Sequence, residues 1–154
     1  MAYVDEFYQR ADVFASYWGA MANEASPIAA ALNSRRKYVA STTLTGPVWA
    51  DTTVLGSDLA AAVRELKARP GGELQLHGSG ELARWLLEHR LVDELNLLVC
   101  PVVVGDGARL FPERGLDMAL ELVESHVYPK GITLLVYRLG GRPEYTRDVV
   151  GVDA

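Results

Sequence analysis

The stretch that decides the fold of this chain covers residues 74–87 and reads LQLHGSGELARWLL. Its first part belongs to Glu73–His77, where polar and apolar residues alternate as they do in a half-buried β-strand. Its last part belongs to Glu81–Glu88, where apolar residues recur at the three- and four-residue steps of an amphipathic helix. A Gly-Ser-Gly sequence at residues 78–80 leaves room only for a tight turn between them. We therefore predict a strand–turn–helix unit, the repeating unit of α/β folds.

This turn has the features of a phosphate-binding site. Gly78 and Gly80 permit a sharp backbone turn and let a phosphate group approach the main chain closely. The start of the helix offers unpaired N–H groups and a partial positive charge. In open α/β sheets, ligands also collect beyond the carboxyl ends of the strands. The turn alone leaves a second interpretation open, a tight connection that binds no ligand.

The segments before this unit alternate between helix and strand. Ser26 and Pro27 mark a helix start, because serine is a good N-cap and proline fits the first helical position. Ser57 is expected to cap a further helix, which ends before Pro70. We predict helices over residues 5–22, 27–33 and 58–69, and strands over Tyr38–Thr42 and Thr52–Leu55.

The segments after the unit are mostly strands. A long apolar strand is expected over Glu94–Val104, bent at Pro101 because proline cannot donate to a ladder. Residues 119–129 and 132–139 are predicted to form a terminal hairpin that turns at Lys130-Gly131. The pattern predicts an α/β fold with a mostly parallel central sheet, an antiparallel C-terminal hairpin and flanking helices.

The composition fits one folded domain. With 154 residues, 49% of them hydrophobic, the chain can bury one sizeable core, and we expect a domain over residues 1–139 and a tail over residues 140–154. The formal net charge of −5 argues against nucleic acid as the main partner. No apolar stretch is long enough to cross a bilayer and no signal peptide is visible, so we expect a cytoplasmic protein that does not bind membranes.

The cysteine and the histidines are weak signals. Cys100, the single cysteine, excludes an internal disulfide and is consistent with a reducing compartment. It lies in an apolar run, which predicts a buried hydrophobic residue rather than a nucleophile. His77, His89 and His126 share no metal-ligand spacing, so no metal site is predicted.

A second candidate binding segment follows the strand that begins near Tyr38. Ser41, Thr42 and Thr43 carry hydroxyl groups that could hold phosphate oxygens. The basic run Arg35-Arg36-Lys37 could add positive charge nearby. An ordinary polar turn explains the same residues, since serine and threonine populate turns for local reasons.

A third candidate segment follows the long apolar strand. Gly105, Asp106 and Arg109 indicate a sharp turn that could face a ligand. The alternative is a wide connection between strands that Leu110 and Phe111 anchor in the core.

Taken in order, three segments resemble one family. They read KYVASTTL (residues 37–44), ELQLHGSGELARWLLEHRLVDELNLLVCPVVVGDGARLFPE (residues 73–113) and GITLLVYR (residues 131–138). They are similar to the reductase domain of the bacterial riboflavin-pathway bifunctional deaminase-reductase, and more closely to its stand-alone dihydrofolate reductase-like relatives. The resemblance runs from about Tyr17 to Arg138, some four-fifths of the chain, and residues 77–112 are its specific part.

The resemblance implies NADPH as the cofactor and hydride transfer to a small heteroaromatic or carbonyl-type substrate, as in dihydrofolate reductase or 5-amino-6-(5-phosphoribosylamino)uracil reductase. It assigns the pyrophosphate to a segment comprising Gly78, Ser79, Gly80, Glu81 and Leu82. It places the adenosine 2′-phosphate near a segment comprising Ser41, Thr42 and Thr43. The substrate-end candidates are Tyr17, Trp18, Gly105, Asp106 and Arg109. Relatives are commonly homodimers, and the apolar Leu95–Val104 segment is a candidate subunit contact.

The start of the chain departs from the family pattern. Relatives begin with a central strand and later have a Gly-Arg-x-Thr loop, whereas Glu6–Ala11 reads EFYQRA. A truncated chain, a partner that fills the gap and a rearranged fold all remain open. No catalytic residue can be named from the sequence. The alternatives to a reductase are a non-catalytic dinucleotide-binding or interaction protein that has lost the family active site, and a structural oligomer that binds no cofactor.

Overall fold

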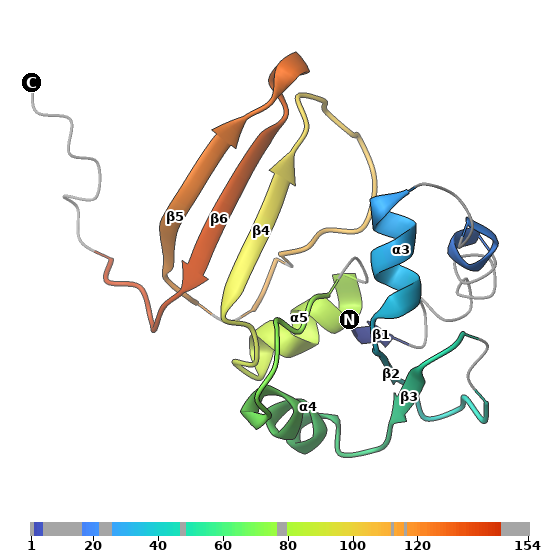
Figure 1. The fold of residues 1–154 in the computed structure, drawn as a ribbon. Helices are drawn as coiled ribbons and strands as arrows, with labels where there is room; N and C mark the ends of the chain where they lie inside the picture. The colour runs from blue at the N-terminus through green and yellow to red at the C-terminus, as the bar shows by residue number, and fades with distance from the viewer. Residues whose placement is uncertain are drawn as a thin grey trace, which may run out of the picture. The chain divides into compact units, whose positions relative to one another are not determined.

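The computed structural model describes residues 2–4, 17–21, 26–46, 49–76, 80–111, 113–115 and 117–145. The chain forms two compact units, Met1–Leu91 and Val92–Ala154 (Figure 1). Each is described by itself below. The α/β class predicted from the sequence is confirmed, since the first unit combines helices with a parallel sheet and the second contains an antiparallel sheet.

The sheet of the first unit has three parallel strands. They are β1 (Ala2–Val4), β2 (Lys37–Ala40) and β3 (Thr52–Leu55), in the order β1-β2-β3. The predicted strands at β2 and β3 are confirmed. Strand β1 was not predicted, because three residues are too few to show the alternation on which such predictions depend.

Helix α3 (Pro27–Ser34) begins where the sequence predicted. The Ser26 hydroxyl accepts a hydrogen bond from the Ala29 N–H at 3.3 Å, and Pro27 occupies the first turn. The helix packs against β2 through Leu32 and Val39, both buried, and the half-buried residues Trp18, Leu44 and Trp49 lie against this pair. Of the helix predicted over residues 5–22, the structure describes residues 17–21; residues 17–20 are helical and residue 21 continues as a single 3₁₀ turn.

A buried lysine ties the end of α3 to β2. Lys37 is only 1% exposed, and its Nζ donates to the carbonyl oxygens of Leu32 at 3.0 Å and Arg35 at 2.7 Å. The ammonium also lies 4.8 Å from the centre of the Trp49 ring. Burial lowers the pKa of Lys37, and the nearby Asp51 carboxylate opposes that shift. One member of the basic run is therefore part of the core.

Asn33 connects the same region through its side-chain amide. Its Nδ2 donates to the carbonyl oxygens of Trp18 at 2.8 Å and Ala29 at 2.9 Å. Its Oδ1 accepts from Trp49 Nε1 at 2.9 Å. Together with Lys37, this amide forms a polar network that holds three segments distant in sequence around one small core.

Helix α4 (Leu59–Ala68) is capped one residue later than predicted. The Asp58 carboxylate, not the Ser57 hydroxyl, accepts from the Ala61 N–H at 3.0 Å. A carboxylate at this position also interacts favourably with the helix dipole, which a hydroxyl does less. Val63 is the buried residue of the helix.

The predicted strand Glu73–His77 is wrong for the residues that the structure describes. Residues 73–76 are irregular, and His77 lies outside the described residues. A strand needs a neighbour that completes its hydrogen bonds, and within the described chain this segment has no ladder partner. The helix that follows, α5 (Gly80–Glu88), is confirmed, with Leu82, Leu86 and Leu87 buried. It contacts β1 within the first unit.

The second unit is an antiparallel sheet. Its strands are β4 (Glu94–Val99), β5 (Leu120–Val127) and β6 (Thr133–Leu139), in the order β4-β6-β5 (Figure 1). The predicted terminal hairpin is confirmed, with a 3₁₀ turn over Pro129–Gly131. The strand predicted to reach Val104 ends at Val99, because Pro101 has no N–H for a ladder.

Two burial predictions in this unit are wrong. Cys100 is exposed, since the strand that was expected to bury it stops one residue earlier. Phe111, which was expected to anchor a loop in the core, is 49% exposed, whereas Leu110 is half-buried. None of the helices in the described part of the chain is long and apolar enough to cross a membrane.

Candidate functional site

The predicted binding segment Ser41–Thr43 lies directly after β2, the middle strand of the parallel sheet. Ser41 is 8% exposed, and its Oγ accepts hydrogen bonds from the N–H groups of Thr43 at 3.2 Å and Leu44 at 2.9 Å. These bonds fold the loop back on itself as a serine turn. Thr42 and Thr43 are exposed at its tip. The Ser41 side chain thus shapes the loop, while the two threonines beside it are exposed residues.

The basic run does not supply the positive charge expected beside these hydroxyls. Arg35, Arg36 and Lys37 lie at the start of β2, whereas Ser41 follows its end, about 13 Å along a strand of this length. Lys37 points into the core, and Arg35 Nη1 contacts Gln75 Oε1 at 3.4 Å. A phosphate at the Ser41 end would need a cation from another segment.

The predicted binding segment of residues 78–82 includes the start of α5. Gly78 and Ser79 lie outside the described residues, and Gly80 is the first residue of the helix. Leu82 is 2% exposed, so its side chain holds the helix in the core and cannot contact a ligand. Glu81 is exposed in the first turn. Its carboxylate stabilises the helix dipole but competes with any anion placed there.

Arg84 brings a cation to this helix start, and the sequence reasoning missed it. A Cβ atom added to Gly80 would lie 3.3 Å from Arg84 Nη1, so the guanidinium lies directly beside the first helical residue. The signal was present in the sequence, because residues four apart share a helix face and side chains lean toward the N-terminus. The arrangement offers main-chain N–H groups and a planar cation, which are the donors that phosphate groups prefer.

Strand β1 links the two segments. It pairs with β2, whose end leads into Ser41, and it contacts α5, which begins at Gly80. Both predicted phosphate-binding segments therefore belong to the same unit and flank the same strand. The donor set fits a phosphorylated cofactor in its chemistry: hydroxyl groups from one segment, and main-chain N–H groups and a guanidinium from the other.

The substrate-end candidates are divided between the two units. Tyr17 and Trp18 are in the first, where Tyr17 is 58% exposed and the two rings meet edge to face at 5.2 Å. Gly105, Asp106 and Arg109 are in the second. Asp106 Oδ1 accepts from the N–H of Gly107, whose φ of 146° favours glycine.

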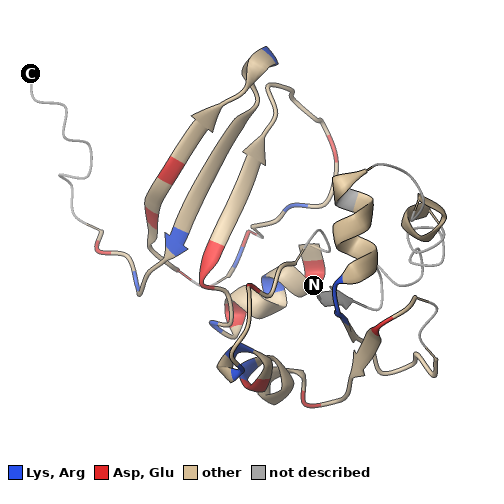
Figure 2. Cartoon of the chain, viewed as in Figure 1, with Lys and Arg blue, Asp and Glu red and all other residues tan. Residues whose placement is uncertain are grey.

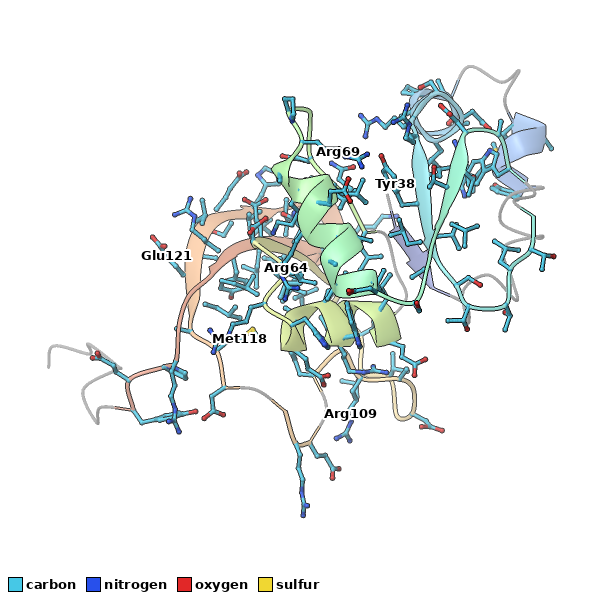
Figure 3. The ribbon with its side chains drawn as sticks, turned by 90° about the horizontal axis from the view of Figure 1, so that it is seen from below. Tyr38, Arg64, Arg69, Arg109, Met118 and Glu121 are labelled. Carbon is cyan, nitrogen blue, oxygen red and sulfur yellow. The ribbon has the colours of Figure 1, made fainter. Side chains whose placement is uncertain are left out.

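The Arg109 side chain is 74% exposed and lies 3.6 Å from Glu113 (Figure 3). Because this ion pair is exposed to solvent, the charge of Arg109 contributes little to the selection of a particular ligand. Among the described residues, no group of three or more histidine, cysteine, aspartate or glutamate side chains could hold a metal ion.

Comparison with known proteins bears directly on the resemblance found in the sequence. A model of the RibD C-terminal domain family matches residues 11–134. The uncharacterized protein YyaP of Bacillus subtilis is 29% identical over 110 residues, which cover 71% of this chain and 58% of that protein. The chain thus spans less than two thirds of the length of this relative.

Two solved structures share the fold. A candidate riboflavin biosynthesis protein of Shewanella sp. PV-4 is similar with a TM-score of 0.68 and 20% identity, over 90% of this chain and 72% of that one. A pyrimidine reductase-like protein of Corynebacterium diphtheriae is similar with a TM-score of 0.56 and 15% identity, over 90% of this chain and 74% of that one. These matches confirm the resemblance and the dihydrofolate reductase-like fold.

Proposed function

The chain belongs to the RibD C-terminal domain family, and from this premise we propose that it is an NADPH-dependent reductase acting on a small heteroaromatic or carbonyl-type substrate. The observation that carries the proposal is the start of α5, where the Arg84 guanidinium lies beside Gly80. NADPH bears a pyrophosphate and a 2′-phosphate, and this unit has two segments with phosphate-binding chemistry. We assign the pyrophosphate to the segment of residues 78–82 and the 2′-phosphate to Ser41–Thr43.

In this proposal, main-chain N–H groups and the Arg84 guanidinium both bind the pyrophosphate. The N–H groups of Gly80 and Glu81, the first two residues of α5, point along the helix axis and are the proposed main-chain donors to phosphate oxygens. The Arg84 guanidinium supplies positive charge, which offsets the repulsion between the nearby Glu81 carboxylate and a bound phosphate. Gly80 keeps the approach open, since any side chain there would meet the guanidinium at 3.3 Å.

The bound cofactor would supply the hydride, and the protein would hold the nicotinamide end against the substrate and keep water out. Tyr17, Trp18, Gly105, Asp106 and Arg109 are the proposed substrate-end groups. We propose a homodimer as the working state, as the resemblance implies.

The first experiment is a calorimetric titration of the purified chain with NADPH. The test variant is Gly80→Asp, which would place bulk and negative charge where the pyrophosphate should lie. The matched control is Gly71→Asp, which adds the same carboxylate to a loop position where a Cβ meets nothing within 4 Å. We expect micromolar-range binding by the wild type and the control, and loss of binding in Gly80→Asp.

A second pair of variants isolates the cation. Arg84→Gln is expected to weaken NADPH binding roughly tenfold, the loss of about one charge-assisted hydrogen bond. Arg64→Gln, an exposed arginine on α4, should leave binding unchanged (Figure 3). If neither the wild type nor any variant releases heat with NADPH, the reductase proposal is wrong. Binding without oxidation of NADPH across a panel of reducible substrates would favour the alternative, a dinucleotide-binding protein without catalytic activity.

A further inference from the structure

We propose that Asn33 is a positioning residue for the substrate end, where its side-chain amide orients the aromatic pair formed by Tyr17 and Trp18. The amide acts through the main chain of Trp18 and does not itself touch the substrate. This inference rests on the proposed function, because it takes Tyr17 as a group that contacts the substrate. All of the residues involved belong to the first unit.

The Asn33 amide is held in one orientation by partners on both of its ends. Its Nδ2 donates to the carbonyl oxygen of Trp18 at 2.8 Å, 15 residues earlier in the chain, and to that of Ala29 at 2.9 Å. Its Oδ1 accepts from Trp49 Nε1 at 2.9 Å, 16 residues later in the chain. A flipped amide would set oxygen against the two carbonyl oxygens and N–H against the indole N–H. The side chain therefore fixes one relation between three segments.

The indole that donates to Asn33 is itself held by a buried cation. Lys37 Nζ lies 4.8 Å from the centre of the Trp49 ring and donates to the carbonyl oxygens of Leu32 and Arg35. Helix α3, which carries Asn33, has no charged residue of its own (Figure 2). The amide is therefore aligned by hydrogen bonds and not by an ion pair. A polar network whose members are satisfied specifies one arrangement of the groups that it joins.

Trp18 is the residue through which the network reaches the substrate end. It belongs to the helical residues 17–20, and its main-chain carbonyl accepts the hydrogen bond from Asn33. Its half-buried side chain packs against Leu32 on α3 and Val39 on β2. The main chain and the ring of Trp18 are thus held by separate contacts, which leaves the residue little freedom to turn.

The Tyr17 ring is oriented in turn by Trp18. The two rings meet edge to face, with centroids 5.2 Å apart and an angle of 86° between their planes, and Tyr17 is 58% exposed. This geometry is preferred because the positive edge of one ring faces the negative face of the other. An exposed side chain that is already oriented loses less conformational entropy when it contacts a ligand. Asn33 thereby prepares Tyr17 for the substrate.

The test is ¹⁹F NMR of the full chain with 5-fluorotryptophan in place of its three tryptophans. Trp18 and Trp49 report on the network, and Trp85 on α5 is the internal reference. The test variant is Asn33→Asp, which keeps the shape of the amide but replaces its donor hydrogens by a carboxylate oxygen. The matched control is Ser34→Asp, which adds the same charge at the exposed neighbouring position of α3.

At neutral pH we expect Asn33→Asp to shift the resonances of Trp18 and Trp49 and to leave that of Trp85 in place. Ser34→Asp should leave all three unchanged. The reverse result for either variant, or equal shifts in both, would overturn the proposal. A separate variant, Tyr17→Leu, should shift the Trp18 resonance alone, which establishes that this resonance reports on the aromatic pair.

Acid provides a rescue of the test variant. Protonation of the introduced carboxyl restores one O–H donor beside one carbonyl acceptor, so in Asn33→Asp the Trp18 resonance should return toward its wild-type position as the pH falls. The wild type, measured over the same range, accounts for the titration of the nearby Asp51 and of His89, whose ring stacks on Trp85. A displacement that persists in acid would indicate lost packing and would contradict a positioning role.

A second variant covers the case in which Asn33→Asp does not fold, which the collapse of all three resonances would reveal. Trp49→Phe keeps an aromatic ring in the cluster but removes the N–H that Asn33 Oδ1 accepts. We expect it to shift the Trp18 resonance, because the amide loses the partner that fixes its orientation. An unchanged Trp18 resonance in this variant would overturn the proposal.

Activity measurements separate this inference from the proposed function. For a compound that the wild type reduces with NADPH, kcat/KM should fall roughly tenfold in Asn33→Asp, as for the loss of one hydrogen bond, with NADPH affinity unchanged. Ser34→Asp should retain the wild-type value. An unchanged kcat/KM in Asn33→Asp would refute the positioning role. If NADPH does not bind or no compound is reduced, the reductase proposal fails, while the ¹⁹F spectra still decide whether Asn33 orients the pair.

Discussion

The two units of this chain differ sharply in where they keep their apolar side chains. Among the described residues, ten of the eleven buried hydrophobic residues belong to the first unit, and Val136 is the one in the second. Conversely, twelve of the fourteen large hydrophobic residues with exposed side chains belong to the second, and only Tyr17 and Leu74 belong to the first. In the first unit, α3 packs against the sheet, whereas the described residues of the second unit include no α-helix.

Regular secondary structure in this chain does not by itself produce a buried core. The second unit has the longer strands, yet many of its apolar side chains remain exposed. Backbone hydrogen bonds are satisfied locally by the hairpin, but burial needs a second layer. We therefore expect the first unit to contribute most of the free energy of unfolding, and the second unit to contribute most of the exposed apolar surface.

The largest expected effect comes from the core of the first unit. Leu82→Ala should lower the free energy of unfolding by about 3 kcal/mol, because it removes a side chain that is 2% exposed and leaves a cavity. Val103→Ala, at a position 97% exposed, should change it by less than about 0.5 kcal/mol. Urea denaturation of both variants at low protein concentration tests the contrast. Equal losses of unfolding free energy in the two variants would show that Val103 is packed in a core of the second unit.

A smaller effect is expected at the buried lysine. Lys37→Met should cost about 1–3 kcal/mol, because the carbonyl oxygens of Leu32 and Arg35 lose their donor while remaining in place. Arg36→Met, at the exposed neighbour, should be close to neutral. Thermal and urea unfolding at neutral pH distinguish the two. A neutral Lys37→Met would mean that the polar network adds nothing to the packing of the first unit.

The same substitution has a predicted pH dependence. Burial lowers the pKa of Lys37 below its ordinary value of 10.5, so in the window between the two values the unfolded chain holds more protons than the folded one. The contribution of Lys37 to stability therefore rises as the pH rises through that alkaline window. The difference in unfolding free energy between wild type and Lys37→Met should increase there, and a difference that falls with pH would contradict the assigned cause.

The smallest effect concerns the start of α4. Asp58→Ala should lower the unfolding free energy by about 1 kcal/mol, since its carboxylate accepts the Ala61 N–H. Ser57→Ala, one residue earlier, should have almost no effect. Chemical denaturation of the two variants side by side tests which residue caps the helix. The opposite ranking would restore the prediction from sequence.

Elements with local signals were predictable from the sequence. The Ser26-Pro27 start, the strands on either side of the Ser41 loop, α5 and the terminal hairpin each depend on neighbouring residues. Features that depend on distant partners were not. The alternation in Glu73–Leu76 predicts a strand, yet a strand forms only where another lies beside it. Cys100 is exposed because the ladder ends before it, which its apolar neighbours do not indicate.

The candidate site was predictable in part for the same reason. Gly80 was located from its place between an apolar segment and a helix. Arg84 was not among the predicted residues, although its spacing from Gly80 places it at the helix start. The burial of Lys37 was not predicted, because three consecutive cationic residues normally lie exposed to solvent.

The burial of Lys37 also gives the molecule an internal reporter of its own opening. The chain contains only three lysines: Lys37 in the core of the first unit, Lys67 on α4, and Lys130 at the tip of the hairpin turn. An amine-acylating reagent would reach Lys130 at once, and Lys67 more slowly because its Nζ donates to the Leu91 carbonyl at 3.0 Å. It would reach Lys37 only when the first unit opens. The rate at which an acyl group appears on the peptide that contains Lys37, which a mass spectrum separates from the acylated N-terminus and the other two lysines, would therefore measure how often that core opens.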